Sequence, residues 1–320
     1  MEEYIPGLIS VIIPTYNRRE MLLGMLETIF AQDYPTVEIL VVDDGSSDGT
    51  MEAVSALAAE RGNLRCFRNE RNSGPGFSRK FGLRQAAGEY VVFADDDDYY
   101  TEPEFFSRAA AILSEDTAME LSAVAANARI LYTQTGEWGE LALPGEGRFS
   151  AAEYLDGFSR HYNKPVSTFT SVFRADALRS GGIEESIQVD DRVIYLRALL
   201  GGDFWLLSEH VGVYRVHESN FSRTVSADFT ITLHRENRMI YDEICRRALL
   251  ALPMEWWYAQ AWIVLRFYIQ NPGSSLLGLG KVFWWLLRQH ISFKRDLTLF
   301  KDALGYWLYR RREKRSNTGQ

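Results

Sequence analysis

Four consecutive aspartates, Asp95, Asp96, Asp97 and Asp98, directly follow the apolar run 90–94. Such a run is typical of a strand buried in a sheet, and ligands of α/β proteins usually bind at the ends of these strands. Four adjacent carboxylates repel one another, so folding alone gives no reason to collect them there. A hard divalent cation, which takes oxygen ligands, would relieve that repulsion. The sequence therefore predicts a cation site here, with an acidic surface turn as the alternative, although such a turn needs only one or two aspartates.

Polar residues also follow the first apolar run, 8–13, in the order Pro14, Thr15, Tyr16 and Asn17. A strand end that opens into a polar loop is where a parallel sheet usually binds a nucleotide. Tyr16 offers a face for stacking, and Thr15 and Asn17 offer hydrogen bonds. The alternative is a plain turn between a strand and a helix.

Asp43 and Asp44 end the second apolar run, 37–42. A calcium-binding loop that began at Asp44 would need a bidentate Glu at its twelfth position, where the chain has Ser55, so this motif is excluded. An acidic group at a strand end can instead accept hydrogen bonds from a base or a ribose.

Asn72 and Gly74 belong to a glycine-rich stretch that precedes Arg79 and Lys80. Such a stretch can bind phosphate at the start of a helix. It lacks the Gly-Lys-Ser/Thr ending of a P-loop, and an ordinary loop is the other interpretation.

Asp190 and Asp191 begin a further amphipathic run, and His217 follows a later strand-like run. The two acids suit the positive end of a helix dipole, or one of them acts as a general base toward an acceptor hydroxyl. A lone His is more often structural, but beside a carboxylate-bound cation it is a suitable further ligand for manganese.

The first hundred residues alternate between strand-like and helical patterns, which favours a parallel sheet with crossover helices. Apolar residues at helical spacing predict the helix 19–31, and helices are also expected at 47–60 and 76–87, with Ser47 or Asp48 as the cap of the second. A third, edge-like strand is expected at 64–67. Beyond residue 101 we expect strands at 119–132, 168–174, 204–207 and 211–216, and helices at 150–158 and 190–200.

The chain has 320 residues, 46% of them apolar, and a net charge of −8. The charge is unevenly distributed along the chain. Residues 288–315 contain nine Lys and Arg and three acids, so their net charge is +6 and that of the rest of the chain is −14. Two cysteines, Cys66 and Cys245, are too few for a disulfide framework and fit a reduced compartment. No signal peptide and no spanning helix are expected, and a cytoplasmic location is predicted, with peripheral contact at the inner face of the membrane.

Taken in order, these motifs resemble those of the family-2 glycosyltransferases of GT-A fold, over about residues 8–222. The resemblance implies an α/β fold with a mostly parallel, Rossmann-like sheet flanked by helices, followed by a helical C-terminal extension. It implies catalysis by Asp191 and a Mn²⁺ or Mg²⁺ ion held by Asp95, Asp97 and His217. The nucleotide-sugar contacts that it implies, together with those suggested by the loops above, are Pro14, Thr15, Tyr16, Asn17, Asp43, Asp44, Asn72, Gly74, Arg79, Asp96 and Asp190. Asp190 stands where the family usually has Glu, Asp96 stands where a small residue is common, and Asp98 has no assigned role.

The implied reaction moves a sugar from a nucleoside diphosphate, with UDP as the expected nucleotide, to a hydroxyl of a glycan or lipid-linked acceptor, and gives a β-linkage. The catalytic domain is expected at 1–228. A helical, aromatic and basic region at 229–320 is expected either to lie in a membrane interface or to form core or a homodimer contact. No nucleic-acid partner is expected. The alternatives are a catalytically silent nucleotide- or glycan-binding module and, on weaker grounds, a nucleotidyltransferase.

Overall fold

A computed structural model describes residues 4–158, 160–217, 225–289 and 291–317. The chain divides into two compact units, Met1–His217 and Glu218–Gln320. The first contains the sheet, and the second is helical over its described residues. The division into domains at residue 228 stays a prediction.

The first unit is built on one ten-stranded sheet. Its main path runs β3–β2–β1–β4–β9–β6–β10–β5, while β7 pairs with β6 and β8 with β10. Strands β3, β2, β1 and β4 are mutually parallel, β9 runs against its neighbours β4 and β6, and β6 and β10 are parallel. The strands are β1 (Ile5–Thr15), β2 (Val37–Asp43), β3 (Leu64–Arg68), β4 (Gly88–Phe93), β5 (Tyr99–Tyr100), β6 (Leu121–Tyr132), β7 (Glu137–Gly139), β8 (Gly147–Phe149), β9 (Ser171–Arg174) and β10 (Asp203–Val216). This mostly parallel α/β sheet confirms the predicted fold class.

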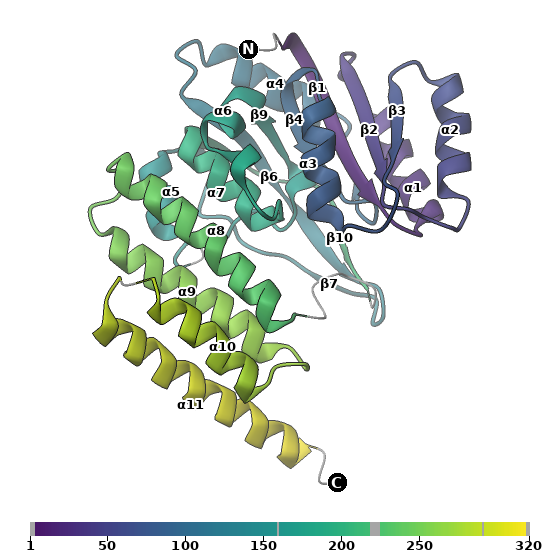
Figure 1. The fold of residues 1–320 in the computed structure, drawn as a ribbon. Helices are drawn as coiled ribbons and strands as arrows, with labels where there is room; N and C mark the ends of the chain where they lie inside the picture. The colour runs from purple at the N-terminus through teal and green to yellow at the C-terminus, as the bar shows by residue number, and fades with distance from the viewer. Residues whose placement is uncertain (1–3, 159, 218–224, 290, 318–320) are drawn as a thin grey trace. The chain divides into compact units, whose positions relative to one another are not determined.

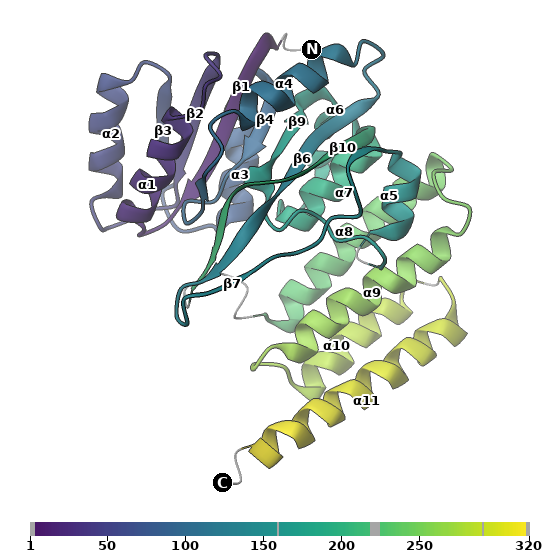
Figure 2. The same ribbon diagram turned by 180° about the vertical axis from the view of Figure 1, so that it is seen from behind.

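Helices cover both faces of the sheet. Helices α3, α6 and α7 lie on the face seen in Figure 1, and α1 and α4 lie on the face seen in Figure 2. The helices of this unit are α1 (Arg19–Phe30), α2 (Thr50–Glu60), α3 (Pro75–Gln85), α4 (Phe105–Glu115), α5 (Ala151–Gly157), α6 (Ala175–Ser180) and α7 (Asp191–Gly201). Two layers of helix leave the central strands buried on both sides, which explains their nearly continuous apolar sequences.

Alternate residues of β1 face opposite helical layers. Ile9, Val11 and Ile13 belong to the core that α1 and α4 cover, whereas Ile12 points at α3. A Cβ atom at Gly82 of α3 would lie 2.4 Å from Ile12 Cγ2. The absence of a side chain at Gly82 therefore lets α3 pack closely on the strand that ends at the polar loop.

The strand order brings the predicted site residues to one edge. β1 lies between β2 and β4, and Thr15 at its end is opposite Asp43. The chain leaves β1 toward β2 and β3 on one side and later returns to β4 on the other. Connections diverge at such a point, and the crevice at the carboxyl ends of the strands is the usual ligand site of an open α/β sheet.

The expected elements of the first hundred residues are all present, with shifted ends. The second helix begins at Thr50 rather than Ser47, and its N-cap is Gly49. Neither Ser47 nor Asp48 is therefore the N-cap, although Asp48 Oδ1 accepts a hydrogen bond from the Thr50 amide at 3.1 Å. Later, the two strands expected at 204–207 and 211–216 form one long strand, β10, whose pairing with β6 shifts register between Leu206 and Gly212.

The second unit consists of α8 (Ala227–Arg246), α9 (Pro253–Gln270), α10 (Leu276–Leu287) and α11 (Phe293–Asn317). Its apolar core includes Trp257, Leu265, Val282, Leu299 and Trp307. The predicted helical C-terminal extension is thus present. Within the described residues, no helix is both long enough and apolar enough to cross a membrane.

Candidate active site

The four aspartates form the turn that follows β4 at the carboxyl edge of the sheet. Asp96, Asp97 and Asp98 are buried, and the Asp95 side chain is about one quarter exposed. Each carboxylate is bonded to side chains or backbone groups from other parts of the chain. The cluster is therefore an organised site rather than a solvated acidic turn.

Asp96 joins the end of β4 to the end of β1. The Thr15 hydroxyl donates to Asp96 Oδ2 at 2.7 Å, and Arg18 Nη1 lies 2.9 Å from Asp96 Oδ1. The same Arg18 nitrogen lies 2.8 Å from Asp97 Oδ2. Arg18 therefore places one cation between two of the four acids, next to the loop predicted to contact the nucleoside.

Asp95 is linked to the start of α7 through a buried arginine. Arg79 Nη2 lies 2.5 Å from Asp95 Oδ1 and 3.1 Å from Asp191 Oδ1. Arg79 is on α3 and is only 5% exposed. Residues from three separate segments therefore meet at one guanidinium, and Asp191, the predicted base, lies beside the predicted metal ligand Asp95.

Asp97 contacts the end of β10. Its Oδ2 atom lies 2.8 Å from His217 Nε2, and its backbone carbonyl accepts a hydrogen bond from Arg215 Nε. The structure thus brings together Asp97 and His217, which are 120 residues apart in the sequence. An imidazole beside a carboxylate is the pairing expected if both contribute to one metal site.

Asp98 is completely buried and bonded on both oxygens. The Ser167 hydroxyl donates to Oδ2 at 3.0 Å, and the Arg215 amide donates to Oδ1 at 3.1 Å. These bonds tie the aspartate turn to the loop before β9 and to β10. Asp98, which the sequence left without a role, therefore positions the turn.

Burial is the main cause of the raised pKa values of Asp95, Asp96 and Asp98. It raises the pKa of Asp96 to about 7 against the opposing charge of Arg18, and Asp97 raises it further. Burial likewise raises the pKa of Asp95 to about 6, opposed by Arg79 and assisted by the charges of Asp191 and Asp97. The pKa of Asp98 lies well above its ordinary value for the same reason. Additional positive charge at this turn would favour the ionised carboxylates.

The oxygen-rich donor set fits a hard divalent cation. One carboxylate oxygen from each of Asp95, Asp97 and Asp98 lies within 4.8 Å of the others. In this structure, Arg18 neutralises part of the negative charge of Asp97, and Arg79 does so for Asp95. Carboxylates with one imidazole suit Mg²⁺ or Mn²⁺ better than a soft metal.

The two acids at the end of β2 have different surroundings. Asp44 accepts hydrogen bonds from the Ser73 amide at 2.9 Å, the Gly74 amide at 2.7 Å and Asn69 Nδ2 at 2.8 Å. Asp43 Oδ1 accepts from the Ser46 amide at 2.9 Å. Arg68 Nε lies 3.6 Å from the buried Oδ2 atom of Asp43, in an ion pair, and among the residues that the structure describes this oxygen accepts no hydrogen bond. Asp44 therefore holds the glycine-rich loop, and Asp43 keeps an acceptor for another group.

The remaining residues of the predicted donor site lie around the same loops. Asn17, at φ +52°, accepts from the Ser47 amide at 2.8 Å, and Asn72 Oδ1 accepts from the Gly74 amide at 3.2 Å. Gly74 itself has φ +88°, which favours glycine. Tyr16 is exposed, as stacking on a ligand requires, while Pro14 pairs with Val42 within the sheet.

Asp190 and Asp191 have different roles at the start of α7. Asp190 is the N-cap, and its side chain accepts from the Val193 amide at 2.8 Å. Burial raises the pKa of Asp190. Asp191 Oδ2 lies 3.9 Å from Lys164 Nζ, so Asp191 is placed between this lysine and Arg79. Capping by Asp190 fixes the helix end that presents Asp191.

Sequence reasoning missed Arg18, Lys164 and Arg215 as parts of this site. Arg18 directly follows the polar residues 14–17 after the first strand, and this position could have identified it as part of the site. Arg215 lies two residues before His217 in the same strand-end segment. Lys164 is in a loop that carries no recognisable pattern, and only the fold brings it to Asp191.

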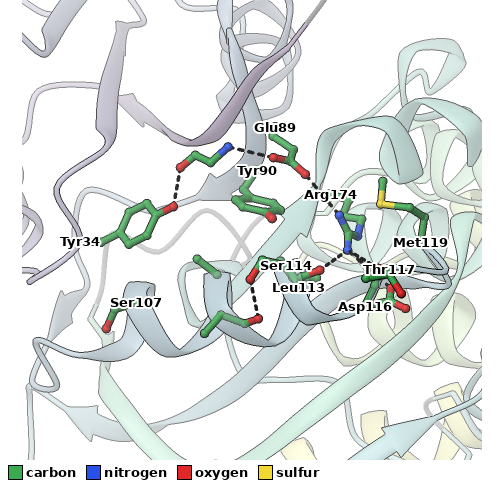
Figure 3. Close-up of a pocket in the computed structure, with 13 residues that line it drawn as sticks. Tyr34, Glu89, Tyr90, Ser107, Leu113, Ser114, Asp116, Thr117, Met119 and Arg174 are labelled. Carbon is green, nitrogen blue, oxygen red and sulfur yellow. Dashed lines mark hydrogen bonds and ion pairs between the residues drawn. The ribbon is translucent and has the colours of Figure 1, made fainter.

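A cavity of about 430 Å³ lies away from this site (Figure 3). It is lined by residues near the opposite ends of β1 and β4, including Gly7 and Glu89. Its polar groups already pair with one another, because the Gly7 amide donates to Glu89 at 2.8 Å and Arg174 Nη1 lies 3.4 Å from Glu89 Oε1. We therefore place the chemistry at the aspartate turn and not in this cavity.

Residues 10–143 match the family model described as Glycosyl transferase family 2. Curated relatives match over shorter stretches. One is the GalNAc(5)-diNAcBac-PP-undecaprenol β-1,3-glucosyltransferase of Campylobacter jejuni, 42% identical over 91 residues, which are 28% of this chain and 29% of that protein. Another is the poly(ribitol-phosphate) β-N-acetylglucosaminyltransferase TarS of Staphylococcus aureus, 41% identical over 109 residues, which are 33% of this chain and 19% of TarS. The matched stretches thus span less than a third of either relative.

The fold is also that of a solved structure over nearly its whole length. Residues 1–349 of S. aureus TarS, in a complex with UDP, superpose with a TM-score of 0.65 at 22% identity, covering 98% of this chain and 92% of that one. This likeness shows that the two chains share the GT-A fold.

Proposed function

We propose that this chain, which carries a glycosyl transferase family 2 domain over residues 10–143, transfers a sugar from a nucleoside diphosphate sugar to a hydroxyl of a glycan or lipid-linked acceptor. The reaction is a single displacement that inverts the anomeric carbon and gives a β-linkage from an α-linked donor. The acceptor oxygen forms a bond to the anomeric carbon as the bond from that carbon to the diphosphate oxygen breaks.

The contact of Arg79 with both Asp95 and Asp191 carries this proposal. Single displacement needs a base near the acceptor oxygen and positive charge near the leaving diphosphate. Asp191 is the base that takes the acceptor proton, and Asp95 belongs to the site that neutralises the diphosphate. Because Arg79 contacts both carboxylates, the two parts of the reaction lie within reach of one bound donor.

The donor nucleoside binds at the ends of β1 and β2. Asp43 Oδ2, which is ion-paired with Arg68 at 3.6 Å, accepts no hydrogen bond among the described residues, and Asp96 is bonded to Thr15 and Arg18 at the neighbouring strand end. The glycine-rich loop at Gly74, which Asp44 fixes, receives the phosphates with the help of the α3 N-terminus. UDP is the proposed nucleotide, and TarS has been solved in a complex with UDP-GlcNAc.

Asp95, Asp97 and His217 are the proposed ligands of a Mn²⁺ or Mg²⁺ ion, with Asp98 as the residue that fixes their turn. When bound, such an ion neutralises negative charge on the diphosphate leaving group. A mannosyltransferase of Pyrobaculum calidifontis, of the same fold at 18% identity and a TM-score of 0.51, has been solved with GDP-Man and Mn²⁺.

The proposed acceptor is a sugar on a polyprenyl diphosphate at the cytoplasmic face of the membrane. Relatives named for undecaprenol-linked substrates support this choice, including the Campylobacter jejuni enzyme and the Escherichia coli β-1,3-glucosyltransferase WfaP, 32% identical over 93 residues. TarS, which is named for poly(ribitol-phosphate), shows that a polymeric acceptor is the other class to test.

A donor screen tests the proposal. Melting temperature is measured with UDP, UDP-glucose, UDP-GlcNAc, GDP-mannose and no ligand, each with and without Mn²⁺, because a ligand that binds the native state raises it.

Nucleoside diphosphate release is then measured for wild type and Asp191→Asn with extracted lipid-linked sugars. We expect Asp191→Asn to keep donor binding and to lose nearly all transfer. Nucleotide binding that ignores the sugar, with no release by either protein, would instead identify a silent binding module, and wild-type rates in Asp191→Asn would remove this residue from the base role.

A further inference from the structure

The outer faces of α10 and α11 expose apolar side chains at helical spacing. On α10, Leu277 is 90% exposed and Trp284 is 58% exposed. On α11, Phe293, Leu297 and Leu308 are exposed. Each helix also buries a second apolar stripe in the core of its own unit, through residues such as Val282 and Leu299. A surface helix of a water-soluble unit normally has a polar outer face, so the exposed apolar stripe needs an explanation.

Cations alternate with these apolar residues. Lys281 and Arg288 share the α10 face with Leu277 and Trp284, because the four positions are three or four residues apart. Lys281 Nζ lies 2.6 Å from Asp228 Oδ1 of α8, in an exposed ion pair that lipid phosphate would replace, whereas Arg288 packs on a ring of the same face. The Arg288 guanidinium lies 5.0 Å from the centre of the Trp284 ring. Lys294 and Lys301 share the α11 face with Leu297, at spacings of three and four residues, and with Leu308, which lies two helical turns beyond Lys301.

The two faces belong to neighbouring helices of one unit. The rings of Phe283 on α10 and Phe300 on α11 stack with centres 4.0 Å apart, and both views show the helices side by side (Figures 1 and 2). Among the described side chains of α10 and α11, Asp302 is an exposed acid, whereas Asp296 is buried. The surface that the two helices present is therefore apolar and strongly cationic.

We propose that this α10–α11 face, defined by Leu277, Lys281, Trp284, Arg288, Lys294, Leu297, Lys301 and Leu308, docks on the surface of an anionic lipid bilayer. Trp and Leu side chains enter the headgroup boundary, and the Lys and Arg side chains pair with lipid phosphates. The long stems of lysine and arginine allow their charges to stay at phosphate depth while the apolar residues lie deeper. The inference deepens the proposed function, because an enzyme held at a bilayer meets a lipid-linked acceptor by diffusion in two dimensions.

Composition favours a bilayer over a second protein. Three of the four cations of this face are lysines, namely Lys281, Lys294 and Lys301. Lysine is depleted in protein interfaces, whereas basic amphipathic helices are typical of membrane surfaces. Charge is also complementary to anionic lipid, since residues 288–315 carry +6 in a chain whose remainder carries −14. A second copy of the same face would bring like charges together.

Flotation of the full-length chain with vesicles tests the proposal. Vesicles are made of phosphatidylcholine alone or of equal parts phosphatidylcholine and phosphatidylglycerol. We expect binding to the anionic vesicles to be stronger by about tenfold or more, and to weaken as salt is added. The double variants Leu277→Glu/Trp284→Glu and Lys294→Glu/Lys301→Glu should each lose about tenfold or more of that binding.

Matched controls lie in the other unit. Trp138, 56% exposed, is the control for Trp284, and the exposed Arg84 is the control for the lysines. Trp138→Glu and Arg84→Glu should bind vesicles as wild type does. Melting temperatures show whether each variant folds, and the thermal shift with UDP-GlcNAc, measured without vesicles, reports the donor site separately. Loss of vesicle binding with an unchanged donor shift supports the inference, whatever the acceptor is.

Three results would overturn it. The first is a wild-type chain that does not float with anionic vesicles. The second is that variants of the face float as well as wild type. The third is a wild-type dimer in sedimentation velocity that Leu277→Glu/Trp284→Glu converts to a monomer while neither protein binds vesicles, because the face would then be a subunit interface. None of these results would contradict the proposed sugar transfer.

Discussion

The Nη2 atom of Arg79 lies 3.1 Å from Oδ1 of Asp191. The same nitrogen also contacts Asp95 Oδ1, at 2.5 Å. Burial alone lowers the pKa of Arg79, but the charges of Asp95 and Asp191 raise it above its ordinary value, so the guanidinium stays charged. One cation thus connects the proposed base to the proposed metal site. A movement of Asp95 or Asp191 that displaces the Arg79 guanidinium therefore also changes the contact of the other carboxylate.

Replacing Arg79 with Ala should damage both stability and transfer. The substitution leaves Asp95 and Asp191 facing each other without their cation, and removal of one partner from a buried ion pair costs about 3 kcal/mol of unfolding free energy. We expect a transfer rate reduced by about a hundredfold or more, since a displaced base loses its reach to the acceptor. Arg84→Ala, an exposed residue of the same helix, is the control for denaturant unfolding and for nucleoside diphosphate release. Unfolding and transfer like those of this control would show that the Arg79 contacts do not matter.

The sequence allowed much of this site to be predicted, because strand ends in an α/β sheet meet at one edge. Thr15, Asp43 and Asp95 each follow a strongly apolar run, so their convergence needed only a parallel strand order. Asp97 and His217 were assigned to one metal site by family resemblance, and the structure places them 2.8 Å apart.

Contacts between side chains were not predictable in the same way. Asp43 and Asp44 are adjacent and chemically identical, and only the structure shows that Asp44 faces the Ser73 and Gly74 amides. Lys164 lies in a loop without periodicity, so no pattern connected it with Asp191. The strand expected at 168–174 is present as β9, but its antiparallel direction was not predicted, because the pattern of a short apolar segment is the same in either direction.

The difference between Asp43 and Asp44 gives a paired prediction. Asp44→Ala removes the acceptor of two backbone amides and one side-chain amide, so we expect about 2 to 3 kcal/mol of lost stability. Asp43→Asn keeps the shape and places an amide where the acceptor oxygen was, so we expect a Kd for UDP raised about tenfold or more with a small change in melting temperature. Calorimetric titration with UDP and thermal unfolding check the two effects. A lower melting temperature for Asp43→Asn with unchanged UDP affinity would assign Asp43 to the fold.

The effect of removing the metal ion on transfer and stability should be measurable separately from the effect of removing the sugar donor. We expect EDTA to abolish transfer and Mn²⁺ to restore it. At a hundred times its Kd, Mn²⁺ should stabilise the wild-type chain by about 2.7 kcal/mol. Asp97→Asn should lose most of this gain, because its carboxylate lies next to both His217 and Arg18. Glu153→Gln, a change of an acid far from the aspartate turn on α5, is the control. An equal Mn²⁺ effect in Asp97→Asn and wild type would place the ion elsewhere.

Lys164 should act as a positioning residue for Asp191. Its Nζ atom lies 3.9 Å from Asp191 Oδ2, donates to the Pro165 carbonyl at 3.0 Å and lies 5.5 Å from the centre of the Tyr195 ring. Burial lowers the pKa of Lys164, and the charges of Asp191 and Asp190 oppose this shift. The lysine is therefore held by backbone and ring contacts in a place where its charge acts on the proposed base.

Lys164→Met should lower kcat by about ten- to a hundredfold and change KM by less, because the donor contacts remain while the base is less well held. Lys164→Arg keeps the charge and should restore most of kcat. A merely structural role would lower the melting temperature and change kcat and KM together in both variants. Lys164 acts on Asp191 only if kcat falls with little change in KM in Lys164→Met and returns in Lys164→Arg.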